Sequence, residues 1–409
     1  MPISSSLIRT SHRAHILGCG MTKLGKLNRP VHALMIEAVE TALANAGVRL
    51  KQLDGLIAVP ALSDPRFMQA HFLGTTLGLL PQQGVVCRTL DTGGAGPISA
   101  LLEADRLIRS HNCDLIAIVA GDAVASMPRD KFLVSADAGC NNPDDPLPSP
   151  VIPSGYDRVA AWQLKSSNLT REQLAMVPVL MGRQAQKHPS AMAYGSRPYT
   201  LDDVLKSKPI APVTNLLECA RRADGAAAVI VASTRFLYEQ GLDHRVAPVI
   251  IAGAEASGPL YPPAVVDEEM FSCERAANMA YQSAQLGPND IDSFFLYDCF
   301  PICFIRAVEA VGLAPKGQGG KWVEDRYKES EINGGKVDPK LFPVNTHGGL
   351  LSFGAPWETP ALFSVVEAVS QLTGTAGDRQ IENCRRSLIY GNGGIFSASA
   401  VAILGRGYY

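Results

Sequence analysis

The feature that most constrains the fold of this chain is an internal repeat. A helical stretch, a glycine, a short linker, an acidic turn and an apolar strand occupy residues 31–59, and the same series returns about 235 residues later, at 274–297. Apolar side chains recur at helical spacing in both helical stretches, and Gly47 and Gly287 are typical helix stops. Solenoid repeats have far shorter periods, so the sequence predicts two similar domains.

Each half continues with the same alternation of strands and helices. Strands are expected at 15–20, 115–120, 249–253, 387–390 and 398–404, and helices at 99–109 and 360–372. The strands are almost continuously apolar, which is typical of mixed or parallel sheets covered by helices on both faces. The predicted fold class is therefore α/β.

The segment between the halves, residues 124–212, has a different composition. It is rich in Pro, Ser, Asp and Asn, and it contains one clear helical stretch, at 171–187. Loops of this length are usually functional or independently structured. We expect an inserted loop domain over an active site, after which residues 219–233 return the chain to the core.

Charge and composition exclude several classes of function. The formal net charge of −2 argues against a general nucleic-acid or membrane-surface binder, because such proteins carry a basic excess. No apolar run reaches the ~18–20 residues that cross a bilayer. The nine cysteines are scattered without a CxxC pair, which favours reduced thiols in an intracellular compartment and predicts no metal site.

The first residues suggest a cellular address. Residues 1–15 hold two Arg, two His, four Ser and no acidic residue, a composition that resembles a mitochondrial presequence. We expect a basic segment at 1–14 and a mitochondrial location, with a disordered tail on a cytoplasmic protein as the alternative. The C-terminal residues GRGYY carry no peroxisomal address.

Short phrases in a fixed order link the chain to a known family. They are YTLDDVL at 199–205, DGAAA at 224–228, YDCF at 297–300 and NTHGG at 345–349. Their order and spacing resemble the thiolase superfamily, and within it the sterol-carrier-protein type of thiolase, over nearly the whole chain.

The resemblance implies the thiolase fold. That fold has two similar βαβαβαββ core domains in a five-layered αβαβα arrangement, plus an inserted loop domain. The expected boundaries are 15–123 with 213–247 for the N-terminal core domain, 124–212 for the loop domain and 248–409 for the C-terminal core domain. Thiolases are generally dimers, so a homodimer is also implied.

One phrase departs from the family pattern, which normally reads HDCF where this chain reads YDCF. The variant is similar to thiolase-like proteins of trypanosomatid protozoa, which are mitochondrial and bind CoA thioesters. It is also similar to bacterial thiolase-like aldolases, which cleave steroid side chains together with an OB-fold partner.

The family's catalytic side chains are missing at the aligned positions. The nucleophilic cysteine lies at a strand-to-helix turn, which aligns with Gly94 to within one residue, and residues 93–96 hold no Cys, Ser or Thr. The histidine that activates it aligns with Ala355, and the second cysteine aligns with Gly391. Cys87 is expected inside a strand as a core thiol.

Backbone donors at these positions are expected to remain. Gly94 and Ala95 would present N–H groups at a helix N-terminus, and Gly393 would complete a second oxyanion hole. Such donors stabilise a transition state by ~3–4 kcal/mol each in enzymes that use them. The alternative for the turn is a glycine-rich segment that serves packing alone.

Three side chains remain candidates for catalysis. Tyr297 can polarise a carbonyl as a phenol, or it is a packed aromatic at a strand end. Asp298 follows it, but neighbouring strand residues point to opposite faces. His347 is the only imidazole near Ala355, and its alternative is a satisfied strand-end histidine.

Covalent thiolysis is excluded on this alignment, and three functions remain open. The first is a protein of lipid metabolism that binds acetoacetyl-CoA or malonyl-CoA, with weak decarboxylation of malonyl-CoA through enolate stabilisation. The second is a retro-aldolase on a β-hydroxyacyl-CoA, acting with an OB-fold or zinc-ribbon partner. The third is a non-catalytic acyl-CoA-binding subunit. In each of them coenzyme A arrives as part of the substrate, and no bound cofactor is expected.

Overall fold

The computed structural model describes residues 12–407. The predicted N-terminal targeting segment lies outside the described residues, apart from residues 12–14. No helix within the described range is both long and apolar enough to cross a membrane.

The N-terminal half contains a five-stranded mixed sheet. Its strands are β1 (Ala14–Met21), β2 (Gly55–Ala58), β3 (Val86–Thr89), β4 (Leu115–Ala123) and β7 (Asp224–Ser233). Their order is β3-β2-β4-β7-β1, with β3, β2 and β4 parallel and β7 antiparallel to both of its neighbours. All positions of β4 and β7 are buried, which explains their unbroken apolar sequences.

The C-terminal half repeats this sheet. Its strands are β8 (Val249–Ser257), β9 (Ser293–Leu296), β10 (Arg386–Gly393) and β11 (Ala398–Gly405), in the order β8-β11-β10-β9. In the position of the fifth strand of the N-terminal sheet, the described part of this sheet has only an isolated parallel β-bridge between Phe294 of β9 and Val344. The two sheets meet where His15 of β1 pairs with Val249 of β8. The predicted duplication is therefore present, and each predicted strand overlaps an observed one.

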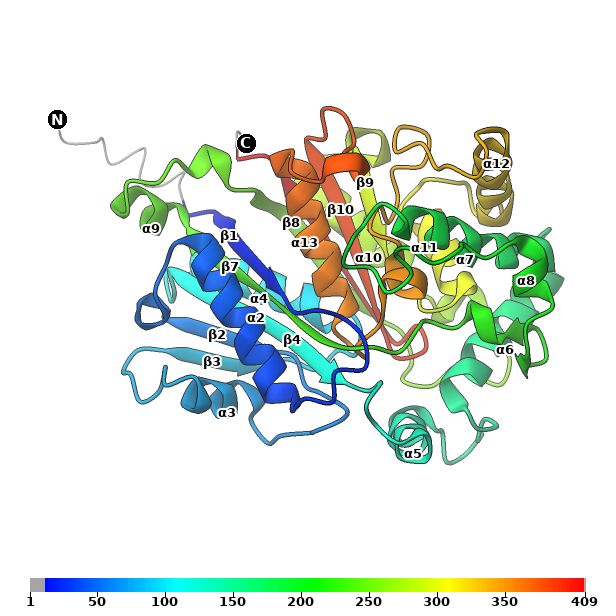
Figure 1. Ribbon diagram of the computed structural model, residues 1–409, viewed down its shortest axis with the longest axis horizontal. Helices are drawn as coiled ribbons and strands as arrows, with labels where there is room; N and C mark the ends of the chain where they lie inside the picture. The colour runs from blue at the N-terminus through cyan, green and yellow to red at the C-terminus, as the bar shows by residue number, and fades with distance from the viewer. Residues whose placement is uncertain (1–11, 408–409) are drawn as a thin grey trace.

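Helices of the two halves cover the sheets, separate them, or extend towards the inserted segment. They are α2 (Val31–Ala46), α3 (Gln69–Thr76), α4 (Gly96–Arg109), α9 (Thr234–Glu239), α10 (Cys273–Ala284), α11 (Pro301–Ala310), α12 (Gly319–Ile332) and α13 (Pro360–Thr373). The outer helices α2 and α3 pack on the first sheet, and α10 packs on the second. Between the sheets, α4 and α13 contact strands of both halves (Figure 1). The layers thus follow the expected αβαβα order.

The inserted segment contains more regular structure than the sequence predicted. It forms helices α5 (Arg129–Cys140), α6 (Val151–Ser166), α7 (Arg171–Ala185) and α8 (Leu201–Leu205), and a short hairpin of β5 (Pro209–Ala211) and β6 (Thr214–Asn215). Only the helix at α7 was expected. Pro153 and Gly155 near the start of α6 are residues that usually interrupt helices. Helix α5 buries only Ala136 and therefore has no clear apolar face in its sequence. In Figure 1 these helices lie to the right of and below the two sheets.

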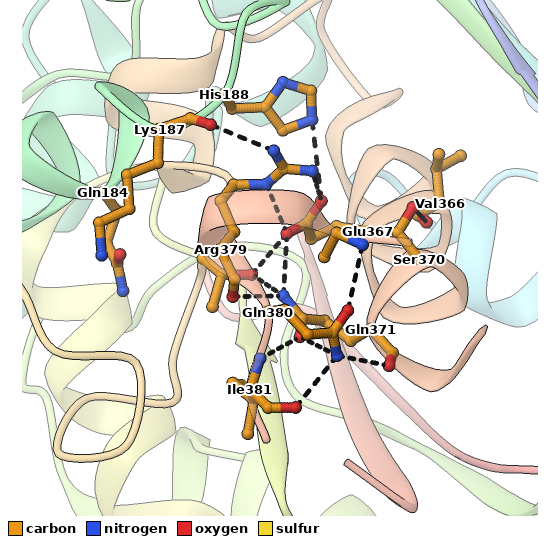
Figure 2. A network of polar contacts seen from close by, with 12 residues as sticks. Gln184, Lys187, His188, Val366, Glu367, Ser370, Gln371, Arg379, Gln380 and Ile381 are labelled. Atoms are coloured by element: carbon orange, nitrogen blue, oxygen red, sulfur yellow. Dashed lines mark hydrogen bonds and ion pairs between the residues drawn. The ribbon is translucent and has the colours of Figure 1, made fainter. Parts of the chain in front are cut away.

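A buried polar network fastens α13 to the end of α7 (Figure 2). Glu367 of α13 accepts hydrogen bonds from Arg379 Nε at 2.9 Å, Arg379 Nη2 at 3.0 Å and Thr346 Oγ1 at 2.7 Å. Arg379 Nη1 donates to the carbonyl of Lys187, just beyond α7, at 3.1 Å. The pKa of His188 is lowered to about 4, chiefly by burial, so this imidazole is neutral at pH 7. Arg379 is therefore the cation that balances Glu367.

Candidate functional site

A cavity of about 1180 Å³ lies where the two core halves meet the inserted helices. Four segments of the core line it: the turn before α4, the residues after β9, the turn between β10 and β11, and the segment before α13. Helices α5 and α6 close the opposite side. The lining from these parts is Asp91–Gly94, Tyr297, Cys299, Phe300, Ala355, Trp357, Glu358, Asn392–Gly394, Phe132, Leu133, Ile152 and Tyr156.

Tyr297 and Gly94 are in direct contact at the centre of this lining. A Cβ atom added at Gly94 would lie 2.1 Å from Tyr297 Oη and 2.5 Å from the carbonyl oxygen of Asn392. The phenol therefore occupies the space in which any side chain at position 94 would begin. Gly94 and Tyr297 are distant in the sequence, yet their side-chain positions compete for the same space.

The two glycine-rich turns also touch through their backbones. A Cβ atom at Gly393 would lie 1.8 Å from the carbonyl oxygen of Thr92, so only glycine fits there. Gly93, with φ +60°, lies beside the same position, with its Cα 3.2 Å from where a Cβ atom of residue 393 would stand. This contact joins the two halves at the cavity and places the start of α4 beside position 393.

Tyr297 is a neutral phenol in the free protein. Burial raises its pKa well above the ordinary value, and the neighbouring Cys299 and Glu358 add to the effect. Its hydroxyl is therefore a hydrogen-bond donor and acceptor at neutral pH rather than an anion.

Tyr156 of α6 holds the turn that carries Gly393. Its hydroxyl donates to the carbonyl of Gly394 at 2.7 Å and accepts from Asn392 Nδ2 at 2.7 Å. Its ring stacks on Phe300 with centroids 4.6 Å apart. An inserted helix thus fixes the geometry of a core turn.

The predicted site residues divide between the cavity and the core. Tyr297, Gly94, Gly393 and Ala355 line the cavity. Ala95 and Gly391 are buried directly behind it, and a Cβ atom at Gly391 would lie 3.0 Å from Ala95 Cα.

Asp298 and His347 are not part of the cavity lining. Asp298 Oδ1 accepts from the backbone N–H of Leu350 at 2.7 Å, and burial raises the pKa of this carboxyl to about 7. Its observed contacts hold the π-helical segment Gly349–Phe353. His347 lies between Phe295 and Phe353, and burial lowers its pKa well below the ordinary value.

Sequence reasoning missed Glu358, Tyr156 and Asn392. The available signal was the phrase GAPWETPALF at 354–363, which is too apolar for an ordinary loop. Ala355, Trp357 and Glu358 of this phrase line the cavity.

Cys140 and Cys219 line the cavity but are not activated nucleophiles. Burial raises the pKa of Cys140 to about 11 and that of Cys219 to about 12. Both are protonated at neutral pH, and a thiol reacts as its thiolate. Across residues 12–407, no group of three or more His, Cys, Asp or Glu side chains is arranged to hold a metal ion.

Comparison with known proteins identifies the family. Residues 265–406 match the family model described as "Thiolase C-terminal domain-like". The acetyl-CoA acetyltransferase of Methanothermobacter thermautotrophicus is 29% identical over 96% of this chain and 99% of its own length. Bovine sterol carrier protein 2 is 27% identical over the whole chain and 75% of its own length. Residues 265–406 belong to the thiolase C-terminal-domain family, and the chain as a whole is sterol-carrier-protein-thiolase-like.

A solved structure extends the likeness to the whole fold. The "Ltp2-ChsH2(DUF35) aldolase" superposes with a TM-score of 0.80 over 98% of this chain and 99% of its own, at 23% identity. The thiolase fold predicted from the sequence is confirmed. This thiolase-like chain keeps the family's two-fold core while Tyr297 fills the space beside Gly94.

The Gly94–Tyr297 contact gives a testable steric prediction. Gly94→Ala should lower the free energy of unfolding by ~1–3 kcal/mol, because the new methyl group overlaps the phenol and the Asn392 carbonyl. Gly287→Ala is the control, since a Cβ atom there meets only Asp290 Oδ2, at 3.9 Å. Urea denaturation measures both variants. Equal stability of the two would mean that the contact is not close-packed.

Proposed function

We propose that this protein cleaves and forms carbon–carbon bonds in β-hydroxyacyl-CoA thioesters by retro-aldol chemistry, without an acyl-enzyme. The proposal rests on the position of the Tyr297 hydroxyl, which lies where the Cβ atom of any larger residue at position 94 would stand. This position supports a site in which a phenol, rather than a nucleophile, faces the thioester.

The lining supports a non-covalent route. Gly94, Ala355 and Gly391 carry no nucleophile or base. A side chain at 94 or 391 would also meet neighbouring atoms at 3.0 Å or less. Cys140 and Cys219 are protonated, as described above, so they do not replace a missing thiolate.

The retro-aldol reaction fits the groups that remain. A base removes the proton of the β-hydroxyl, the Cα–Cβ bond breaks, and its electron pair moves into the thioester as an enolate. The β-carbon leaves as a ketone or aldehyde, and the enolate carbon takes a proton to give a shorter acyl-CoA. Tyr297 and the N–H groups at the start of α4 would stabilise the enolate oxygen.

The mouth and the walls of the cavity suit an acyl-CoA. Arg221 and Arg222 line it. The pKa of Arg222 is lowered by burial and then by the nearby Arg129, which identifies a cluster of cations. Guanidinium groups bind phosphates well. Leu133, Ile152 and Leu217 provide apolar walls for an acyl group.

Malonyl-CoA decarboxylation fits this lining less well. Decarboxylation removes no hydroxyl proton, so it would leave the cavity-lining carboxyl group of Glu358 without a role. A non-catalytic acyl-CoA-binding subunit is the remaining alternative, and it is an outcome of the test below.

Two kinds of assembly accompany the proposal. The aldolase of similar fold is described as a complex of Ltp2 with the DUF35 protein ChsH2, so we propose a DUF35-type partner here. Strand β3 ends the described sheet and pairs only with β2, which leaves an edge suited to a second copy in a homodimer.

The decisive assay uses 3-hydroxy-3-phenylpropanoyl-CoA and 3-hydroxy-3-methylbutanoyl-CoA. The expected products are benzaldehyde or acetone, together with acetyl-CoA, measured by mass spectrometry. Exchange of the α-protons of acetyl-CoA in D₂O reports enolate formation directly. Absence of both cleavage and exchange would contradict the proposal and favour a binding subunit. Carbon dioxide release from malonyl-CoA would favour decarboxylation, and rapid thiolysis of acetoacetyl-CoA would contradict the non-covalent route.

Binding alone should stabilise the fold. Acyl-CoA at 100 times its Kd should raise the free energy of unfolding by about 2.7 kcal/mol, because it binds the folded state only. Thermal denaturation with acetyl-CoA and acetoacetyl-CoA measures the effect, with adenosine as the control ligand. No shift with any acyl-CoA would contradict the binding site itself.

A further inference from the structure

Glu358 is a cavity-lining carboxyl group with an unused oxygen. Its Oε2 atom is shielded from solvent and has no hydrogen-bond partner among residues 12–407. The side chain of Trp357 donates to the same carboxyl group. An unpaired buried polar atom costs free energy, so one that belongs to a cavity-lining side chain calls for an explanation, such as a ligand.

A structural role explains this carboxyl group poorly. The comparison within the same chain is Glu367, whose oxygens accept from Arg379 and Thr346. Buried carboxylates that serve folding are paired in this way. For Glu358, no cation is among the groups that shift its pKa.

The backbone that presents Glu358 is strained. Trp357 has φ +48°, a left-handed conformation that a bulky side chain rarely adopts. Its indole is held edge-on against Phe132 of α5, with ring centroids 5.8 Å apart. Strained residues cluster at functional sites, where the surrounding structure keeps them in place. Trp357 and Glu358 both line the cavity, so the strained backbone is part of the site.

Acidic groups from four elements lie around Glu358. They are Asp91 before α4, Asp122 of β4, Tyr297 after β9 and Cys140 at the end of α5. Burial, then Asp91 and then Asp122 raise the pKa of Glu358 to about 8. A base with such a pKa accepts and returns a proton near physiological pH.

We propose that Glu358 is the acid/base of this site, with its cavity-lining carboxyl group placed to take the proton of the substrate β-hydroxyl. This role rests on the proposed retro-aldol function. Glu358 accepts the hydroxyl proton as the Cα–Cβ bond breaks, and the protonated carboxyl then returns a proton to the enolate carbon. Tyr297 acts at the other end of the substrate, on the thioester oxygen. The proton is conserved over the cycle, and no further reactant is needed.

The test combines Glu358→Gln with a pH profile. We expect kcat/KM for 3-hydroxy-3-phenylpropanoyl-CoA to rise through about pH 8 in the wild-type protein, because the ionised base is the active form. In E358Q, kcat should fall by ~10²–10³-fold. The rise of kcat/KM through about pH 8, called the rising limb below, should disappear, while acetyl-CoA still stabilises the fold of the variant. Glu172→Gln, at an exposed carboxylate in the first turn of α7, is the control and should leave the profile unchanged.

A second variant guards against a folding defect in E358Q. Asp91→Asn removes a charge that raises the pKa of Glu358, so the rising limb should move to lower pH. A rising limb that stays in place in D91N, or one that persists in E358Q, would overturn the role of Glu358 while leaving retro-aldol cleavage intact. A wild-type protein that releases no benzaldehyde and exchanges no α-protons would overturn both proposals.

Discussion

Tyr297→Phe should lower the kcat of carbon–carbon cleavage by ~10²–10³-fold, because it removes one donor from a preorganised, water-poor site. The ring stays in place and only Oη is lost, so the packing beside Gly94 loosens slightly without a new clash. KM and the thermal shift with acetyl-CoA should change little, since the proposed contacts with CoA are made by Arg221 and Arg222 rather than by Tyr297. Steady-state kinetics and thermal denaturation measure the two effects separately.

Tyr281→Phe is the matched control for that variant. Tyr281 is also buried, and its hydroxyl donates to the carbonyl of Val311 at 2.8 Å, outside the cavity lining. Its loss should cost ~1 kcal/mol of stability and leave kcat unchanged. Equal kcat for Y297F and the wild-type protein would mean that the phenol does not contact the reacting thioester.

Arg379→Ala should lower the free energy of unfolding by ~3–5 kcal/mol, because it leaves Glu367 as an unpaired charge in the core. The two side chains are 11% and 2% exposed, and Arg379 also donates to the Lys187 carbonyl (Figure 2). Urea denaturation at pH 7 measures the loss.

Two control variants test whether the loss of stability comes from the buried charge of Glu367. Lys206→Ala breaks the exposed pair with Asp202, whose side chains are 75% and 69% exposed, and should cost no more than ~0.5 kcal/mol. The double variant Arg379→Met with Glu367→Met should recover most of the loss, since no charge is then buried alone. A loss below ~1 kcal/mol in R379A would mean that water reaches Glu367.

The regular elements of the core were readable from the sequence. The helix at 31–46 and the strands at 115–120 and 398–404 have apolar patterns that packing reinforces, so local and global preferences agree. The helices α5 and α6 were not readable, because α5 buries little and α6 starts at a proline-rich segment. The contact between Gly94 and Tyr297 could not be predicted from the sequence, because the two residues belong to opposite halves and only the folded structure brings them together.

Of the site residues, Tyr297 was predicted and Glu358 was missed. Tyr297 follows a strand and stood out against a family pattern, whereas Glu358 lies in irregular backbone and has no periodic signal. Strand alternation does not apply to Asp298, because β9 ends at Leu296, and its carboxyl group accepts from the backbone N–H of Leu350 outside the cavity lining.

The shared volume of Gly94 and Tyr297 also restricts how such a chain can evolve. A cysteine at 94 and a tyrosine at 297 exclude each other, because the Cβ atom of one would stand 2.1 Å from the hydroxyl of the other. A mutational path between the two chemistries must therefore shrink residue 297, and also shift the Asn392 carbonyl that lies 2.5 Å from the same Cβ position, before residue 94 gains a side chain. The reverse order passes through an intermediate with a steric overlap at its centre, so the order of substitutions is dictated by the packing.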